Sequence, residues 1–387
     1  VRSEAWPSRS AVTRYSIVWG GCRTSLGPKI LYGKEVPEIT SSLEEGGRIG
    51  GQPARLLCNS GMSFKGYDLG GDGFQLTRAE AGAMIREDPR NAQVLFRYLN
   101  GKDLNSNPTQ EGDGWVICFG ERSLEDARTF RAPFARIEET VLPVRLESNR
   151  KAHRDRWWIY AESRPALTRE LSAAKKVIAL SAVSRFAVPA MIPIGAIMSS
   201  AIVVVPDASF GRLAALTSAA HLSWVLRWGS LMKLDIRYST SDVFDTFPFP
   251  RDLGSLDRVG AMLDGERREI MTRRGLGLTK LYSMVNDAGI GNASDEDVAR
   301  MRDIHIRLDE AVIEAYGWSD VQLDHGFHTY RQTERWTIGP AARTEILDRL
   351  LEENHRRAAA EAAEKPKSAT RGREPKALSE GMETLFS

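Results

Sequence analysis

The sequence predicts an α+β protein in which a mixed α/β domain is followed by an all-α helical bundle. Short apolar segments cut by glycines dominate up to residue 250, whereas amphipathic stretches with helix caps dominate after it. The run Phe247-Pro248-Phe249-Pro250 marks the change, because proline continues neither a strand nor a helix. We therefore expect a mixed domain over 1–250 and a helical domain over 251–363. The tail 364–387, rich in Ala, Glu, Lys and Arg, is typical of disorder.

Length and composition indicate two domains of a soluble globular protein. The chain has 387 residues, of which 42% are hydrophobic and 27% charged, and a net charge of only +2. Its three cysteines form no CxxC pair, which fits a reducing cytoplasm and argues against a zinc ribbon or a disulfide framework. The first residue is Val1 and no signal peptide follows it. We expect a piece of a longer polypeptide, with simple trimming as the alternative.

In the first half the expected elements are short. We expect a strand within 11–19, short strands within 54–76, and a helix over 77–87 that begins with a Thr77/Glu80 capping box. Turns around a polar loop follow over 94–108, then a strand over 115–119 and a helix over 123–141 that Pro143 ends.

Residues 186–206 carry no charge and are nearly long enough to span a membrane. Pro189, Pro193 and Gly195 would break such a helix, so we expect two short buried strands joined by a turn, and no membrane partner.

Helices dominate the second half. We expect one helix over 209–228, with His221 on its apolar face as a core residue, and further helices over 255–274, 276–286, 294–316 and 340–363. A Ser294/Asp297 box, a stop at Gly317 and Pro340 in the first helical position mark their ends. The aromatic-proline run, with Trp224, Val225 and Trp228, should pack the mixed domain onto the helical one, leaving 230–241 exposed and braced by Asp242.

Residues 143–185 hold the densest basic run, with ten Lys and Arg against four Asp and Glu. Trp157, Trp158 and Tyr160 are interleaved with these cations, a pattern that suits phosphate contacts plus stacking on nucleic acid. The alternative is that these aromatic side chains point into the core.

We find no catalytic constellation and no metal site in the sequence. It contains no GxxxxGK[ST], HExxH or GxSxG motif. His325 and His328 could form half of a metal site, but no third ligand of suitable spacing lies nearby.

Several short motifs, in a shared order from about Trp6 to Arg357, resemble the C-terminal half of type IIG (MmeI-like) adenine-specific DNA methyltransferases. That family belongs to bacterial restriction-modification and phage-defence systems. The phenylalanine-proline run is also similar to the end of recognition domains in type I specificity subunits. The matching motifs are WPSRSAVTRYSIVW, RYLNGKDLNSNP, WVICFGERS, RDRWWIYAESRPAL, KKVIALSAVS, HLSWVLRWGSLMKLDIRYSTSDVFDTFPFP, GLTKLYSMVND, HIRLDEAVIEAYGW, LDHGFHTYR and ARTEILDRLLEENHRR.

The resemblance implies a target recognition domain that reads double-stranded DNA and presents one flipped adenine for N6 methylation. The family's catalytic domain binds S-adenosylmethionine and holds the adenine with an Asn/Asp-Pro-Pro-Tyr/Phe motif. This sequence departs from that pattern, because Asn107-Pro108 is followed by Thr109. We therefore expect no cofactor in this chain and no methylation by it alone. S-adenosylmethionine is expected in a methyltransferase domain or subunit that is missing here and acts as a partner.

The candidate DNA-binding residues form two groups. Cations of the basic run suit phosphates, and residues after the strand IALSAVS and after Gly229 suit base edges. Alternatively, the chain is an interaction or scaffold subunit whose basic run is merely solvated. A complete enzyme with unrecognised chemistry is the third hypothesis. The phosphate candidates are Arg150, Lys151, Arg154, Arg156, Lys175 and Lys176, and the base-edge candidates are Arg185, Lys233, Arg237, Tyr238 and Ser239.

Overall fold

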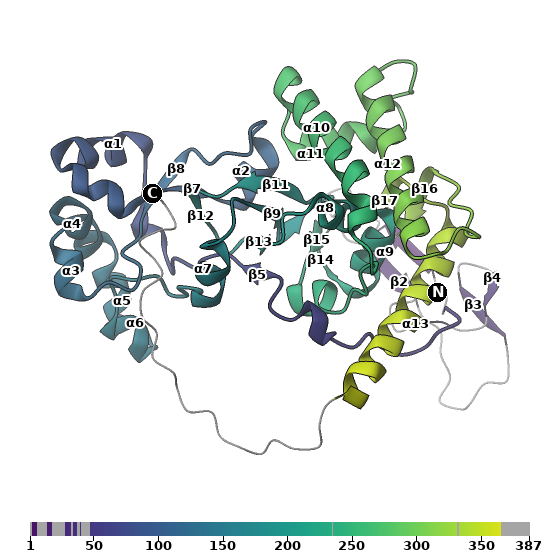
Figure 1. Cartoon of the computed structure of the whole chain (residues 1–387), viewed down its shortest axis with the longest axis horizontal. Helices are drawn as coiled ribbons and strands as arrows, with labels where there is room; N and C mark the ends of the chain where they lie inside the picture. Colours follow the sequence, from purple (N-terminus) through teal and green to yellow (C-terminus); the bar gives the residue numbers. More distant parts are fainter. Residues whose placement is uncertain are drawn as a thin grey trace.

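The computed structural model describes residues 2–5, 14–17, 28–31, 34–36, 39, 47–233, 235–330 and 333–364. Figure 1 shows a mixed lobe on the left, small sheets in the middle and a helical part on the right. The predicted fold class is thus confirmed. The expected disordered tail lies outside the described residues, except for its first residue, which ends a helix.

Two antiparallel strand pairs precede the main body: β1 (Arg2–Ala5) with β2 (Arg14–Ile17), and β3 (Lys29–Leu31) with β4 (Lys34–Val36). Of the strand expected within 11–19, the described part is β2.

The mixed lobe is built around one sheet with the strand order β12-β7-β8-β6. Its strands are β6 (Gln75–Leu76), β7 (Leu95–Leu99), β8 (Gly114–Ile117) and β12 (Ala196–Met198). Helices α1 (Arg78–Glu87), α2 (Gly101–Ser106), α3 (Leu124–Arg128), α4 (Arg131–Thr140), α5 (Leu142–Leu146), α6 (Lys151–Asp155) and α7 (Pro165–Leu171) belong to this half of the chain. Short 3₁₀ turns η1 (Leu57–Asn59), η2 (Asp72–Phe74) and η3 (Pro89–Gln93) connect them.

The aromatic residues of the basic run belong to the core of this lobe. Trp157, Trp158 and Tyr160 are each less than a tenth exposed. The Tyr160 hydroxyl donates to the Ile117 carbonyl at 2.9 Å, and Trp158 Nε1 donates to the Arg122 carbonyl at 3.0 Å. The core alternative is therefore confirmed, and stacking of these three rings on nucleic acid is wrong.

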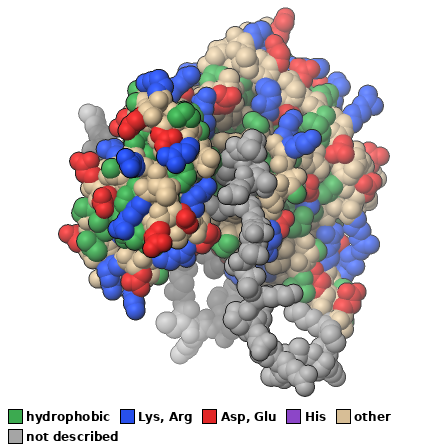
Figure 2. Space-filling model, turned by 60° about the vertical axis from the view of Figure 1, so that its left-hand side comes forward, with side chains coloured by type: hydrophobic (Ala, Val, Ile, Leu, Met, Phe, Trp, Pro, Cys, Tyr) green, Lys and Arg blue, Asp and Glu red, His purple; other side chains and the backbone are tan. Residues whose placement is uncertain are grey.

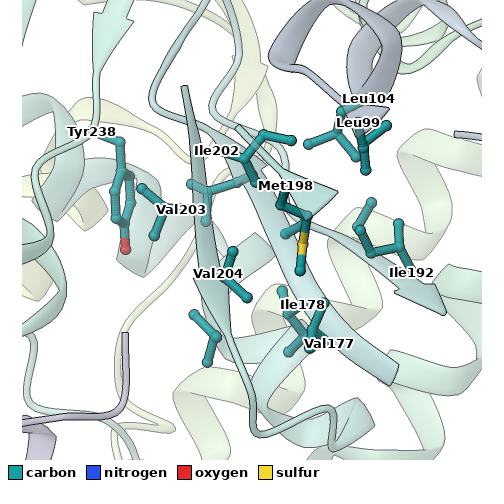
Figure 3. Close-up of a cluster of buried hydrophobic side chains, with 14 of the residues drawn as sticks. Leu99, Leu104, Val177, Ile178, Ile192, Met198, Ile202, Val203, Val204 and Tyr238 are labelled. Atoms are coloured by element: carbon teal, nitrogen blue, oxygen red, sulfur yellow. The ribbon is translucent and has the colours of Figure 1, made fainter. Parts of the chain in front are cut away.

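A second sheet lies at the centre of the molecule, with the order β11-β9-β13-β5 and all pairs antiparallel. Its strands are β5 (Phe64–Lys65), β9 (Lys176–Ser181), β11 (Ala190–Pro193) and β13 (Ile202–Val205). Figure 3 shows side chains of β9, β12 and β13 meeting in one apolar cluster.

The apolar run 186–206 therefore forms three short strands, β11, β12 and β13, where we expected two. Gly195, at φ +137°, allows the tight connection through which the chain leaves one sheet for the other. Among the described residues, no helix combines the length and apolar character that crossing a bilayer requires.

Local signals explain most helix ends, and several predictions need correction. The helix expected over 123–141 is two helices, α3 and α4. The Thr77/Glu80 box is confirmed. Pro143 lies in the first turn of α5 and so begins a helix rather than ending one. The polar loop expected over 94–108 contains β7 and α2 instead, because the Asn100 side chain caps α2. The helix expected over 209–228 is two helices, α8 (Phe210–Thr217) and α9 (Ala219–Trp228), since Ser218 caps a new start.

The helical part contains α10 (Asp257–Arg274), α11 (Leu278–Val285), α12 (Glu296–Ala315) and α13 (Pro340–Glu364), preceded by η5 (Gly254–Leu256). Pro340 begins α13 as predicted, and Gly317, at φ +75°, follows α12. The α12 cap is Asp295 rather than Ser294. The carboxylate of Asp295 accepts from two backbone N–H groups, which a serine hydroxyl would not hold as strongly.

An unpredicted hairpin, β16 (Gly326–Tyr330) with β17 (Thr333–Thr337), joins α12 to α13. It packs on Arg302, whose guanidinium carbon lies 4.9 Å from the Phe327 ring and 5.1 Å from the Trp336 ring. The same guanidinium donates to the carbonyls of Val285 and Ile290. The hairpin is thus fixed by a residue about 30 positions away in the chain.

The aromatic-proline run joins the two halves as expected. Phe247 and Phe249 are buried, and the Phe247 ring lies 4.8 Å from that of His221 and 6.0 Å from that of Trp224. From the helical part, Arg357 donates to the Phe249 carbonyl at 2.8 Å. The run therefore packs against α9 on one side and α13 on the other.

Segment 47–58 lies along α13. The Asp348 carboxylate accepts from the N–H of Arg48 at 2.9 Å and of Ile49 at 3.3 Å. The Asn354 amide makes two bonds of 2.8 Å, one with the Ala54 N–H and one with the Ala54 carbonyl. Side chains of α13 thus make the hydrogen bonds that hold the backbone of this segment against the helix.

Candidate nucleic-acid interface

Two strands between Gly229 and the aromatic-proline run form a small sheet with a third strand from residues 183–184, in the order β10-β15-β14. Its strands are β10 (Val183–Ser184), β14 (Ser230–Met232) and β15 (Asp235–Arg237). Val183 and Ser230 both lie opposite Arg237, so these three side chains share one face. Ile236, on the other face, is buried. The Arg237 face is therefore the solvent face, which we call the recognition face.

Two more base-edge candidates border the recognition face. Arg185 follows β10 directly, is exposed, and places its guanidinium carbon 5.3 Å from the centre of the Phe186 ring. Lys233 lies in the β14–β15 turn, is exposed, and has φ +61°, as the first residue of a two-residue hairpin turn commonly does. The sequence prediction placed Arg185 after one strand and both Lys233 and Arg237 in the loop after Gly229. The sheet brings these two parts of the chain together.

Tyr238 must be removed from the base-edge candidates. It is 2% exposed, because it alternates with Arg237 and so shares the inner face with Ile236. The Leu216 carbonyl accepts from His221 Nδ1 at 2.9 Å, so His221 Nε2 is the acceptor for the Tyr238 hydroxyl at 3.1 Å. Burial raises the pKa of Tyr238 and lowers the pKa of His221 to about 4, so both side chains are neutral near pH 7. Tyr238 anchors the sheet to α9.

Ser239 has a structural role as well. Its hydroxyl accepts from the Asp242 N–H at 3.3 Å and caps η4 (Thr240–Phe244), a π-helical turn. Asp242 braces the same turn, as predicted, by accepting from the Ser241 hydroxyl at 3.0 Å. Because Ser239 is only partly exposed, it is a weaker base-edge candidate than the three cations.

The phosphate candidates lie away from the recognition face and in two groups. Arg150, Lys151, Arg154 and Arg156 lie on or beside α6, which Figure 1 places at the lower left, whereas β14 and β15 lie nearer the centre. Lys175 and Lys176 lie at the start of β9, and β10 follows its end. A six-residue strand is roughly 20 Å long, which separates this pair from the recognition face.

The α6 cations already have neighbours of opposite or polar character. Arg156 pairs with Glu121 at 2.8 Å and Arg150 with Glu162 at 4.0 Å, and Arg154 donates to the Ser148 carbonyl. These arginines are 48% and 72% exposed in the two ion pairs, so each pair contributes little to stability. On the face in Figure 2, Lys and Arg are interspersed with Asp and Glu. Arg145, also from the basic run, is buried and donates to the Leu69 carbonyl.

The histidines considered as metal ligands have other partners. His325 Nε2 donates to the Asp309 carboxylate at 2.9 Å, and His328 Nε2 bonds the Asp324 carbonyl at 2.9 Å. The described part of the chain contains no group of three or more His, Cys, Asp or Glu that could hold a metal ion. His221 is a core residue with both ring nitrogens bonded, as expected.

Comparison with known proteins gives two matches. The family model described as "MmeI, target recognition domain" matches residues 58–251, half of the chain, and this range includes the whole recognition face. Among solved structures, the fold is similar to that of the type IIL restriction-modification enzyme MmeI in complex with DNA, with a TM-score of 0.57 and 17% sequence identity. The match covers 84% of this chain and 39% of that one, so the chain spans about two fifths of the length of MmeI. No curated protein matches the chain.

Proposed function

This chain belongs to the MmeI target recognition domain family, and on that premise we propose that it reads a short sequence in duplex DNA. The observation that carries the proposal is the recognition face, where Arg185, Lys233 and Arg237 are exposed on one three-stranded sheet. A narrow β-ribbon fits the major groove of B-DNA, in which each base pair presents a distinct pattern of donors and acceptors.

The chemistry of the face suits guanine-containing sites. The guanidinium groups of Arg185 and Arg237 can each bond guanine O6 and N7 together, and Lys233 can bond the same acceptors singly. Asp235, exposed on β15, adds an acceptor suited to the amino group of cytosine. Each such contact distinguishes the right base from a wrong one by about 1–3 kcal/mol.

The remaining cations set affinity and orientation. The cations assigned to phosphates lie at two places away from the recognition face, on or beside α6 and at the start of β9, where they would contact the duplex backbone on either side of the bases that are read. They are Arg150, Lys151, Arg154, Arg156, Lys175 and Lys176. If all six contact phosphates, log K falls by about 5 for each tenfold rise in salt.

The catalytic step lies, in this proposal, outside these 387 residues. The recognition domain presents one adenine to a methyltransferase domain or subunit that binds S-adenosylmethionine and transfers the methyl group to N6. The resemblance of the sequence to bacterial restriction-modification and phage-defence enzymes supports this assignment. It also supports a cytoplasmic location, where the DNA substrate is.

Titration of duplexes of defined and randomised sequence at two salt concentrations tests the proposal. Arg150→Ala with Arg154→Ala should weaken all duplexes alike and reduce the salt slope, since phosphates carry no sequence information. Lys233→Ala and Arg237→Ala should instead change the order of preferred sequences. Arg300→Ala, an exposed cation on α12, is the matched control and should change neither.

Two outcomes would contradict the proposal. Binding that is absent or insensitive to salt would exclude DNA reading and favour the interaction-subunit hypothesis. Identical effects of both variant pairs would show that base contacts and phosphate contacts are not separated as described.

A further inference from the structure

A cavity of about 60 Å³ lies where the mixed half of the chain meets the helical part. Its walls come from residues 186–189, α8 and α9 on one side, and from α11, α12 and β17 on the other. Because one water needs about 10–15 Å³ on this scale, the space holds roughly four waters or one small polyatomic ion.

Arg335 of β17 lines this cavity and is 5% exposed. Its Nη2 donates to the Arg185 carbonyl at 3.0 Å, whereas its Nε has no hydrogen-bond partner. Among the described residues, no carboxylate lies within ion-pair distance of it. Burial, with a smaller effect of Arg185, lowers the pKa of Arg335 to about 10, so it is still a cation at pH 7. A buried cation without a counter-ion is unfavourable, and cations in such positions are normally paired.

A second cation converges on the same place. The guanidinium carbon of Arg335 lies 5.5 Å from the centre of the Phe186 ring, and that of Arg185 lies 5.3 Å from it. Two like charges are therefore held around one aromatic ring, which an anion between or beside them would stabilise.

The carboxylate in the cavity wall does not fulfil this role. Asp309 accepts from the Ala219 N–H at 2.6 Å through one oxygen and from His325 Nε2 at 2.9 Å through the other. Its two oxygens thus have their own donors, from α9 and from the segment before β16. Water could satisfy the Arg335 Nε, but it would not neutralise the charge.

We propose that Arg185 and Arg335, placed around Phe186 beside this cavity, form a binding site for a phosphate-type oxyanion. Guanidinium groups bind tetrahedral oxyanions through paired, charge-assisted N–H···O bonds, and the cavity has room for one such group. Arg185 and Phe186 come from the recognition domain and Arg335 from the helical part. The bound anion therefore ties the two parts together at the edge of the recognition face.

The site can be tested without DNA, so its failure is distinguishable from failure of the proposed function. Inorganic phosphate is titrated into the 387-residue chain at constant ionic strength, with chloride as the balancing ion, and followed by calorimetry and ³¹P line broadening. We expect saturable binding to one site. Arg335→Met, of similar length without the charge, should weaken it by about tenfold or more, as loss of a charge-assisted bond implies.

Two further variants keep the test decisive. Arg185→Met alters an exposed side chain, so it leaves the fold intact and should also weaken phosphate binding about tenfold. Lys102→Met removes an exposed cation on α2 that has no part in either proposed site, and should leave phosphate binding unchanged. Binding that is not saturable, that chloride reproduces, or that Arg185→Met and Lys102→Met affect equally would overturn the site and leave a water-filled cavity.

Competition identifies the source of the phosphate group. Displacement of inorganic phosphate by duplex DNA would support a backbone phosphodiester as the ligand. Simultaneous binding of both would support a free oxyanion that acts on the contact between the two parts.

Discussion

The variant Tyr238→Phe tests whether Tyr238 stabilises the fold beneath the recognition face without contacting DNA bases. The substitution keeps the ring and removes only the hydroxyl that donates to His221 Nε2 at 3.1 Å. Because this nitrogen is buried, losing its donor should cost about 1–3 kcal/mol of unfolding free energy. With a urea m value of about 3 kcal/mol/M, the unfolding midpoint should fall by roughly 0.3–1 M. The order of preferred DNA sequences should not change, since the hydroxyl does not reach solvent.

The adjacent residue provides the opposite control. Arg237→Ala alters an exposed side chain on the other face, so the free energy of unfolding should stay within about 0.5 kcal/mol of the wild-type value. The free-energy difference with which this variant distinguishes the preferred base from a wrong one should change by about 1–3 kcal/mol at one base pair. Both variants are measured by urea unfolding and by binding to a duplex library. If Tyr238→Phe keeps its midpoint and changes the preferred sequence, the assignment of the two faces is wrong.

Two other predictions concern stability. Asn354→Leu removes an amide that bonds both backbone groups of Ala54 and the Thr246 carbonyl, and should destabilise the fold by about 2–5 kcal/mol; unchanged calorimetric unfolding would show that α13 does not hold segment 47–58. Burial lowers the pKa of both His221 and His305 to about 4, below the value near 6.5 of an unfolded histidine. Protons therefore bind the unfolded chain first, and stability should fall as the pH drops from 6.5 to 4, by up to about 3 kcal/mol per histidine. A urea midpoint that stays constant between pH 6.5 and 4 would contradict this prediction. His221→Gln should make the unfolding free energy depend less steeply on pH.

Features with a local cause could be predicted from the sequence. The Thr77/Glu80 box and the proline that begins α13 depend on neighbouring residues. The alternation of Ile236, Arg237 and Tyr238 also indicates that Tyr238 points inward. The prediction missed this because the tyrosine hydroxyl was taken as a group that contacts bases. The hairpin β16–β17 could not be found in this way, because Arg302 of α12 fixes it.

The candidate site was only partly predictable, because cations close in sequence need not be close in space. The basic run 143–185 is one dense stretch of the sequence, yet it divides among α6, the start of β9 and the end of β10. Arg145, from the same run, is buried as a donor to a backbone carbonyl. Conversely, Arg335 lies 150 residues from Arg185 and contacts it directly. The pairing of strands decides which cations lie close together in space, and the density of charge along the sequence does not predict that pairing.

The contact between segment 47–58 and α13 has a consequence for synthesis on the ribosome. Asn354 follows Ala54 by 300 residues, so at about 5–20 residues per second the segment waits roughly 15–60 s for its partner helix. The recognition domain is complete long before α13 leaves the ribosome. Until then the backbone N–H and carbonyl of Ala54 lack the amide that they bond in the folded chain.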